Sequence, residues 1–270
     1  YMQIIKLSIF RKYFLDPYIE NVEKILEQSK KYKDYYYTNI FGRWFSQFSE
    51  KYSLPKTLIG NPQNTISINN YRVANTYFAS FIRIHNFSKC VDFSNVKNVF
   101  EIGGGFGSMC HTLLTLFPNI KKYLYLDIPP ILYVATQYLK FIFEEKVIDY
   151  RDTKDLDKIR FSSNDEREII AICPWQIEKV DVHIDLFWNS ASFQEMAPEM
   201  VINYIQHVNR MLKNHSSKLC IYIYKGGKPE KTILPEELIR LIENNIPITF
   251  EELIPEIEVA KSHYYLGRSS

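Results

Sequence analysis

A cluster of glycines is the clearest candidate for a binding site in this 270-residue sequence. Four of its nine glycines lie within five positions, directly after Val99–Ile102 and directly before Ser108–Leu114. The four are Gly103, Gly104, Gly105 and Gly107. Glycine adopts positive φ without steric cost and lets a ligand lie close to the backbone. The pattern therefore predicts a strand, a tight turn and a helix, with a nucleotide-type cofactor lying on the turn.

The spacing of these glycines distinguishes between two nucleotide cofactors. Gly103, Gly105 and Gly107 form the pattern G-x-G-x-G, and Glu101 stands two positions before the first of them. The dinucleotide pattern G-x-G-x-x-G requires a glycine at position 108, where this chain has Ser108. The spacing therefore favours S-adenosylmethionine (SAM) over NAD.

A second candidate ligand-binding residue is Asp127. It lies near the end of the apolar run Tyr123–Ile128, 24 residues after Gly103. In a strand-helix-strand unit that binds a nucleoside, the second strand delivers an acid to the ribose hydroxyls. Because SAM and NAD both contain that ribose, Asp127 supports a nucleoside ligand without choosing between the two.

Residues from 96 onward alternate between strand and helix patterns. The five strands expected in this alternation are Val96–Glu101, Tyr123–Ile128, Glu168–Cys173, Val182–Asn189 and Lys218–Tyr224. Such repeated units predict right-handed crossovers and a parallel sheet. Two further short strands, Ile248–Leu253 and Glu256–Ala260, are separated only by Pro255, which favours an antiparallel hairpin at the sheet edge.

Residues 1–95 follow a different pattern. Helical periodicity covers Pro17–Lys31, Tyr35–Tyr52 and Asn70–Phe87, and we identify no strand pair there. A segment rich in Pro, Gly and Asn, Leu54–Asn64, predicts a loop. We therefore expect a helical N-terminal region over residues 1–95 and a cofactor-binding α/β domain over residues 96–270.

Composition narrows the cellular context. A net charge of +2 gives no reason to expect nucleic acid or an anionic membrane as a partner. No apolar stretch approaches the roughly 18 residues that a transmembrane helix needs. The widely spaced Cys90, Cys110, Cys173 and Cys220 indicate buried free thiols in a reducing cytoplasm. The chain begins with Tyr1 rather than Met, which suggests a piece of a longer protein.

Four segments together resemble a known family. They are Glu101–Gly107, Tyr125–Pro129, Cys173–Gln176 and Trp188–Met196. Through them, residues 96–225 resemble the sugar O-methyltransferases, a bacterial branch of the class I SAM-dependent methyltransferases associated with surface polysaccharide synthesis. The first segment is shared by the whole superfamily, and the last carries the sugar assignment. The resemblance implies a Rossmann-like, mostly parallel sheet with an antiparallel last strand, and methyl transfer from SAM to a hydroxyl of a sugar or nucleotide sugar.

The cofactor site is expected where the carboxyl ends of the parallel strands meet. Loops after the strands bring together the residues that we expect to contact SAM. These are Glu101, Gly103, Gly104, Gly105, Gly107, Asp127, Ile128, Pro174, Trp175, Asn189 and Ser190. Trp175 is expected beside the adenine or the acceptor, or alternatively in the core.

A sugar hydroxyl is a poor nucleophile until it loses its proton, so a general base is expected. The candidates are Glu195, His263 and His111. Two of them have a structural alternative: Glu195 as a carboxylate that favours the start of the following helix, and His111 as a core histidine. No group of residues has the spacing of a metal site, although the sequence leaves a divalent ion open.

Acceptor binding is expected from two further residues. Gln194 lies in the sugar-associated segment, and Arg72 has the chemistry to hold a phosphate of a nucleotide sugar. Arg72 belongs to the region 1–95, which we expect to cover the strand ends as a lid, or alternatively to pack on the sheet or form a homodimer interface.

Three other functions remain open from the sequence. One is methylation of another small hydroxylated or carboxylated metabolite on the same scaffold. Another is a SAM-fold subunit without activity that serves as an interaction module. An NAD-dependent nucleotide-sugar oxidoreductase is disfavoured by Ser108 and by the lack of a Tyr-x-x-x-Lys pair.

Overall fold

The computed structural model describes residues 31, 34, 35, 38, 39, 41–212, 217–224, 233–245, 248–255 and 263–269. The chain divides into two compact units, Tyr1–Phe78 and Ala79–Ser270, and the division passes through helix α3 (Asn75–Phe87). This division falls earlier in the chain than the domain boundary expected after residue 95. The separate functions assigned to the two regions stay a prediction.

The first unit contains a helix and a β-hairpin. Residues 41–51 are helical. Strand β1 (Thr65–Ile68) pairs antiparallel with β2 (Tyr71–Ala74). The expected loop between helix and hairpin is present, whereas nearly all of the helix expected at Pro17–Lys31 lies outside the described residues.

The hairpin corrects two expectations, that this region has no strand pair and that a helix begins at Asn70. β-branched residues such as Ile66 and Val73 flank the turn, and Asn69 takes a φ of +53°. Asparagine tolerates this left-handed conformation, and β-branched side chains favour strands. The helix α3 therefore begins only after the hairpin, at Asn75.

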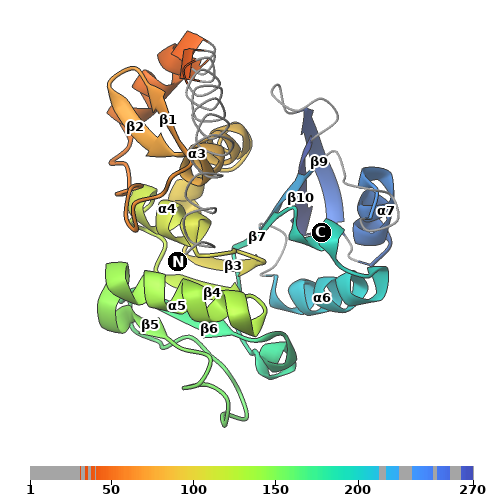
Figure 1. The fold of residues 1–270 in the computed structure, drawn as a ribbon. Helices are drawn as coiled ribbons and strands as arrows, with labels where there is room; N and C mark the ends of the chain where they lie inside the picture. Colours follow the sequence, from red (N-terminus) through yellow and green to blue (C-terminus); the bar gives the residue numbers. More distant parts are fainter. Residues whose placement is uncertain are drawn as a thin grey trace, which may run out of the picture. The chain divides into compact units, whose positions relative to one another are not determined.

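The second unit is built around one eight-stranded sheet. In spatial order the strands are β5 (Val147–Ile148), β6 (Glu168–Ile172), β4 (Lys122–Leu126), β3 (Asn98–Ile102), β7 (Leu186–Ser190), β8 (Lys218–Ile223), β10 (His263–Ser269) and β9 (Ile248–Pro255). Strands β5 to β8 pair parallel, and β10 pairs antiparallel with both β8 and β9 (Figure 1). This arrangement confirms the predicted mostly parallel α/β sheet.

The far end of the sheet differs from the expected hairpin in one respect. An antiparallel strand at the end of the sheet is confirmed, but the partner of β9 is β10, which the sequence analysis did not predict as a strand. Because β10 lies between β8 and β9, β9 forms the edge. The strand expected at Glu256–Ala260 lies outside the described residues. The two-residue strand β5 is too short to leave a sequence pattern.

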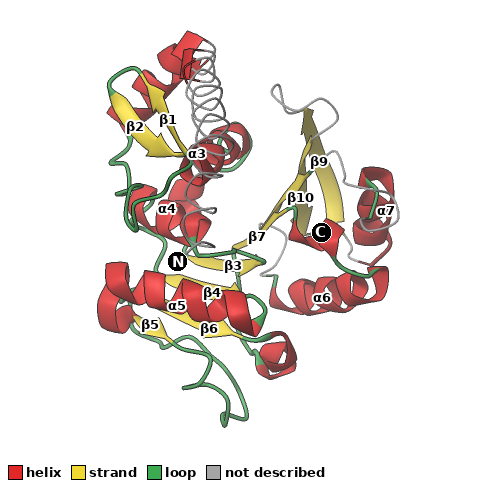
Figure 2. Ribbon diagram, in the orientation of Figure 1, coloured by secondary structure: helices red, strands yellow, loops and turns green. Residues whose placement is uncertain are grey.

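Helices cover the sheet on both faces (Figure 2). They are α4 (Ser108–Leu116), α5 (Pro129–Phe143), α6 (Pro198–Met211) and α7 (Pro235–Asn245). Three of these begin at proline, whose fixed φ suits the first helical position. Residues of α6 and α7 share a buried core with the face of the sheet that contains Phe100 and Phe187. On the opposite face, the ring of Phe87 from α3 lies 5.1 Å from that of Trp188.

The state of the cysteines and the polarity of the helices are two further properties of the chain. The four cysteines are thiols rather than disulfides; Cys110, Cys173 and Cys220 are buried and Cys90 is half-buried. Within the described residues, every helix is too short or too polar to traverse a bilayer.

A nearly buried ion pair fastens the amino ends of β4 and β6. The ammonium of Lys122 donates hydrogen bonds to Glu168 Oε2 at 3.1 Å, Asn164 Oδ1 at 3.0 Å and Ser162 Oγ at 2.7 Å. The side chains of Lys122 and Glu168 are only 7% and 13% exposed. Removing one member would leave the other charge buried without its partner, which is costly.

We expect Lys122→Ala to lower the free energy of unfolding by about 3 kcal/mol or more. The control is Lys158→Ala, which breaks the exposed pair between Lys158 and Asp181 and should cost less than about 1 kcal/mol. Urea unfolding of both variants measures the difference. Equal losses would contradict the importance of burial for this pair.

Candidate functional site

The glycine turn lies at the carboxyl end of β3, as the sequence predicted. The amide of Gly103 donates to the carbonyl of Leu126 at 2.8 Å, and the hydroxyl of Tyr125 donates to the carbonyl of Gly105. Gly105 has a φ of +64°, and a Cβ placed on it would meet no atom within 4 Å. The turn is therefore fixed from below by β4, while its face at Gly105 is open for a ligand.

Asp127 follows β4 and lies against this turn. Its Oδ2 accepts from the amide of Gly105 at 2.9 Å, and its Oδ1 accepts from the amide of Ile128 at 2.8 Å. Burial raises the pKa of the half-buried Asp127, the two amide hydrogen bonds oppose this, and the charge of Glu195 adds to it. Because each carboxylate oxygen has a further lone pair, Asp127 can also accept hydrogen bonds from two hydroxyls.

Glu101 lies beneath the turn rather than on its open face. It is fully buried, and its Oε2 accepts from the hydroxyl of Tyr123 at 2.7 Å. Among the described residues, Oε1 has no hydrogen-bond partner. Burial raises the pKa of Glu101 to about 8; the hydrogen bond from Tyr123 and the charge of Arg83 lower it, and that of Asp127 raises it. A Cβ on Gly104 would lie 2.8 Å from Oε2, so glycine is required above this carboxyl.

The end of β7 is tied to the end of β3 by side chains. The buried Asn189 donates to the carbonyl of Ile102 at 3.0 Å and to Ser192 Oγ at 2.7 Å. Ser190 Oγ accepts from the indole of Trp188 at 2.9 Å. Asn189 therefore joins β7 to the residue before the glycine turn, whereas the Ser190 hydroxyl bonds within β7.

The two residues that follow in the 3₁₀ helix Ser192–Glu195 have different surroundings. The amide of Gln194 is buried and bonds to the backbone of Tyr224 and Ile233, at 2.6 to 3.2 Å. It therefore joins the loop after β7 to the loop after β8. Glu195 is exposed, and its charge acts on Asp127. The side chain of Glu195 is therefore accessible to solvent at this edge, whereas that of Gln194 is not.

The two candidate histidines also differ in position. His111 is 4% exposed, and its Nδ1 lies 2.9 Å from the hydroxyl of Tyr138, where α4 packs on α5. Burial lowers the pKa of His111 to about 4. His263 begins β10 opposite Ile223, the last residue of β8, so its backbone lies at the carboxyl edge. Its side chain lies outside the description.

Two exposed apolar side chains follow neighbouring strands at this edge. Ile128 comes after β4 and is 55% exposed, and Trp175, next to Pro174 after β6, is 65% exposed. Because β4 and β6 pair in parallel, both residues lie at the same edge of the sheet. Exposed apolar groups of this kind can flank a planar base.

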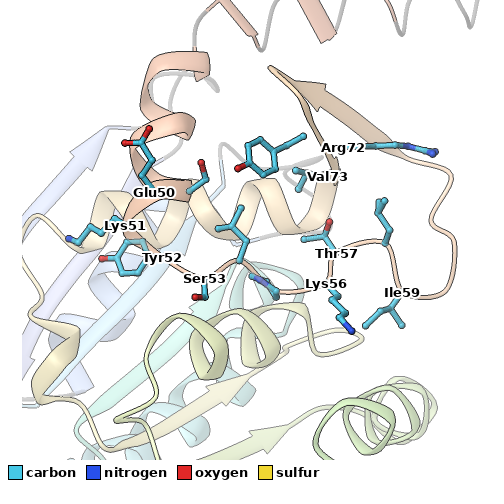
Figure 3. A pocket seen from close by; sticks show the side chains of 14 residues that line it. Glu50, Lys51, Tyr52, Ser53, Lys56, Thr57, Ile59, Arg72 and Val73 are labelled. Atoms are coloured by element: carbon cyan, nitrogen blue, oxygen red, sulfur yellow. The ribbon is translucent and has the colours of Figure 1, made fainter.

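Arg72 lies in the first unit, on β2. Its Nε donates to Thr65 Oγ1 at 3.2 Å. It borders a pocket of about 740 Å³ that is also lined by Lys51, Tyr52 and Lys56 (Figure 3). The pocket combines three cationic residues and one acidic residue, Glu50, with aromatic surface.

The structure adds residues that the sequence analysis did not select. Tyr125 donates to the Gly105 carbonyl, and its position two residues before Asp127 is the signal that could have identified it. Arg83, in the otherwise apolar stretch Phe81–Ile84 of α3, is a second addition. Within the described part of the chain, no three His, Cys, Asp or Glu residues group as metal ligands.

Comparisons with known proteins agree with this architecture. A family model for an O-methyltransferase domain matches residues 68–158. The structure of the mitomycin 7-O-methyltransferase MmcR is 16% identical, with a TM-score of 0.51 over 71% of this chain and 54% of its own. The pyocyanin biosynthetic protein PhzM is 12% identical, with a TM-score of 0.51 over 71% and 56%. RosA from Streptomyces davawensis is an N,N-8-amino-8-demethyl-D-riboflavin dimethyltransferase. It is 12% identical, with a TM-score of 0.51 over 72% of this chain and 55% of its own.

These likenesses show that the chain has the class I methyltransferase fold. The chain spans about half the length of these solved structures. No curated protein sequence matches it. The matching family model describes O-methyltransferases in general and carries no sugar specificity, so the comparisons support the methyltransferase part of the expected resemblance but not its sugar branch.

The glycine turn yields a matched pair of substitutions. Gly104→Ala places a Cβ 2.4 Å from the buried ring of Tyr125 and should cost about 1–3 kcal/mol of stability. Gly105→Ala meets no neighbour and should cost only about 1–2 kcal/mol through its positive φ. Its methyl group should nevertheless lower affinity for S-adenosylhomocysteine. Urea unfolding and calorimetry test this, and unchanged affinity would show that no cofactor lies on Gly105.

Glu101 should make stability depend on pH. Its folded-state pKa of about 8 lies above the ordinary value of 4.5, so the folded state retains a proton that the unfolded state loses. The stability that this proton supplies is complete below pH 4.5 and is lost as pH rises toward 8. Relative to wild type, Glu101→Gln should therefore gain stability over this window, by up to about 1.4 kcal/mol per pH unit. Parallel pH profiles of urea unfolding would contradict the raised pKa.

Proposed function

We propose that this protein is a SAM-dependent O-methyltransferase that acts on a small hydroxylated molecule. The observation that carries the proposal is the hydrogen bond between Asp127 and the amide of Gly105 at the open carboxyl edge of the sheet. It holds a carboxylate that can accept hydrogen bonds from ribose hydroxyls beside a turn that has room for a ligand. The match of residues 68–158 to an O-methyltransferase domain supports the choice of reaction.

The residues at this edge fit the parts of SAM. Asp127 has free lone pairs for the ribose hydroxyls, the open face of Gly105 admits the methionine chain, and Trp175 with Ile128 can enclose the adenine. When bound, SAM supplies a methyl group attached to a positively charged sulfur. The fixed turn beneath it orients this group, which is a large part of catalysis because displacement requires alignment of the reacting atoms.

The acceptor hydroxyl needs a group that takes its proton. Glu195 suits this role best among the three candidates, because its carboxylate is exposed at the same edge and is electrostatically coupled to Asp127. His263 is the second candidate, by the position of its backbone. His111 is disfavoured by its burial between α4 and α5 and by its hydrogen bond to Tyr138.

The acceptor class is a finer proposal. The segment Trp188–Met196 supports a sugar or nucleotide sugar through its resemblance to sugar O-methyltransferases. MmcR is described as acting on mitomycin, and RosA as acting on a riboflavin derivative, which favours a non-sugar small molecule as the alternative. We propose that Arg72 and its pocket contribute to acceptor binding; the cationic lining supports an anionic acceptor.

The proposed function predicts ligand-dependent stabilisation. S-adenosylhomocysteine at about 100 Kd should raise the stability of the wild type by about 2.7 kcal/mol, because it binds only the folded state. Asp127→Ala should weaken this binding by roughly 10- to 100-fold through loss of charge-assisted hydrogen bonds. Thermal melts and calorimetry measure both effects, with the exposed Asp155→Ala as control. A melt raised by NADH and unmoved by S-adenosylhomocysteine would overturn the proposal.

A further inference from the structure

Arg83 presents an uncompensated positive charge close to the proposed site. It lies on α3, and its guanidinium carbon lies 4.3 Å from the centre of the Tyr222 ring. Its Nε is buried and has no hydrogen-bond partner among the described residues. Within the same residues, no carboxylate lies within ion-pair distance of it. A partly buried arginine normally has such a partner, since removing its charge from water is costly.

The surroundings of Arg83 place it toward the carboxyl edge of the sheet. Phe87 on α3 contacts Trp188, and Arg83 lies one helical turn earlier, over Tyr222. Tyr222 lies two residues beyond Cys220, the partner of Trp188, and pairs with Ser190 at the end of β7. Arg83 therefore lies on the same side of the sheet as Trp188, near the end where the cofactor is proposed to bind.

The positive charge of Arg83 interacts electrostatically with a carboxyl group of the site. It lowers the pKa of Glu101, the carboxyl beneath the glycine turn. That carboxyl is buried against Tyr123 and Gly104, so it does not supply Arg83 with a hydrogen-bonded partner. The guanidinium keeps its planar set of donors, and stacking on Tyr222 fixes its orientation.

We propose that Arg83 binds a carboxylate or phosphate of a ligand held at the carboxyl edge. Guanidinium groups bind both anions with paired hydrogen bonds, and the Tyr222 ring orients the guanidinium for this contact in advance. The inference rests on the proposed function for the nature of the site. Two sources supply the same chemistry: an acidic group of the acceptor, and the carboxylate of the methionine moiety of SAM.

Strand geometry favours the acceptor as the source. Tyr222 is on β8, which is separated from β3 by β7, so Arg83 stands about two strand spacings, roughly 10 Å, from the glycine turn along the sheet. A group bound there lies across β7 from the turn, on the side where the acceptor must approach.

The test uses two variants of Arg83. Arg83→Gln removes the charge, and Arg83→Lys keeps the charge but lacks the planar guanidinium that lies over the Tyr222 ring. The control is Arg240→Gln, an exposed arginine on α7 with the same loss of charge. Thermal melts establish that the variants are folded. Calorimetry then measures binding of S-adenosylhomocysteine, of 5′-methylthioadenosine, which lacks the amino-acid carboxylate, and of inorganic pyrophosphate to the complex with S-adenosylhomocysteine.

Binding through the acceptor predicts that Arg83→Gln weakens pyrophosphate binding by roughly 10- to 100-fold, with S-adenosylhomocysteine unaffected. Binding through the cofactor predicts a similar loss for S-adenosylhomocysteine and none for 5′-methylthioadenosine. In either case Arg83→Lys should recover only part of the affinity, and Arg240→Gln should match wild type. If Arg83→Gln matches wild type for all three ligands, the proposal is overturned.

If the wild type binds none of the adenosyl ligands, the proposed function fails separately from this inference. In that case pyrophosphate is titrated against the free protein. A loss of its binding in Arg83→Gln alone would still support an anion site at Arg83, and no loss would overturn it.

Discussion

The candidate site depends on the parallel register of β3 between β4 and β7. In this register Ile102 is paired with Leu126 on one side and with Asn189 on the other, so three strands end at the same level. The glycine turn is thereby hydrogen-bonded to Asp127, and the loop after β7 is hydrogen-bonded to the carbonyl of Ile102 just before the turn. A shift of one residue in either pairing would turn Asp127 or Asn189 to the opposite face of the sheet.

Hydrogen bonding within this edge explains why several expected ligand-binding residues serve the fold. Asn189 and Ser192 close the end of β7 onto β3, and Gln194 joins two loops through their backbones. The amides of Asn189 and Gln194 are buried, and a buried amide without partners would be destabilising. The groups left open to a ligand are fewer: the face of Gly105, the second lone pairs of Asp127, and the side chains of Glu195 and Trp175.

The sequence predicts the parts of the fold that follow from local pattern. The glycine spacing and the acid at position 127 identify the turn and its partner strand, because each depends on a short stretch of chain. The β1–β2 hairpin escapes prediction because its strands are only four residues long and adjoin a true helix. The contact between Arg83 and Tyr222 joins residues more than a hundred positions apart, and the burial of Glu101 arises from packing that no local pattern encodes.

The position of β10 affects the order in which the sheet can be completed. Residues 263–269 are the last described strand in the chain, yet they pair with β8 on one side and β9 on the other. While the ribosome is still adding these residues, β8 and β9 each expose unpaired backbone groups along a full edge. Such edges can recruit strands from other chains. Pairing of β10 with both strands covers these two edges, and only the outer side of β9 remains at the border of the sheet.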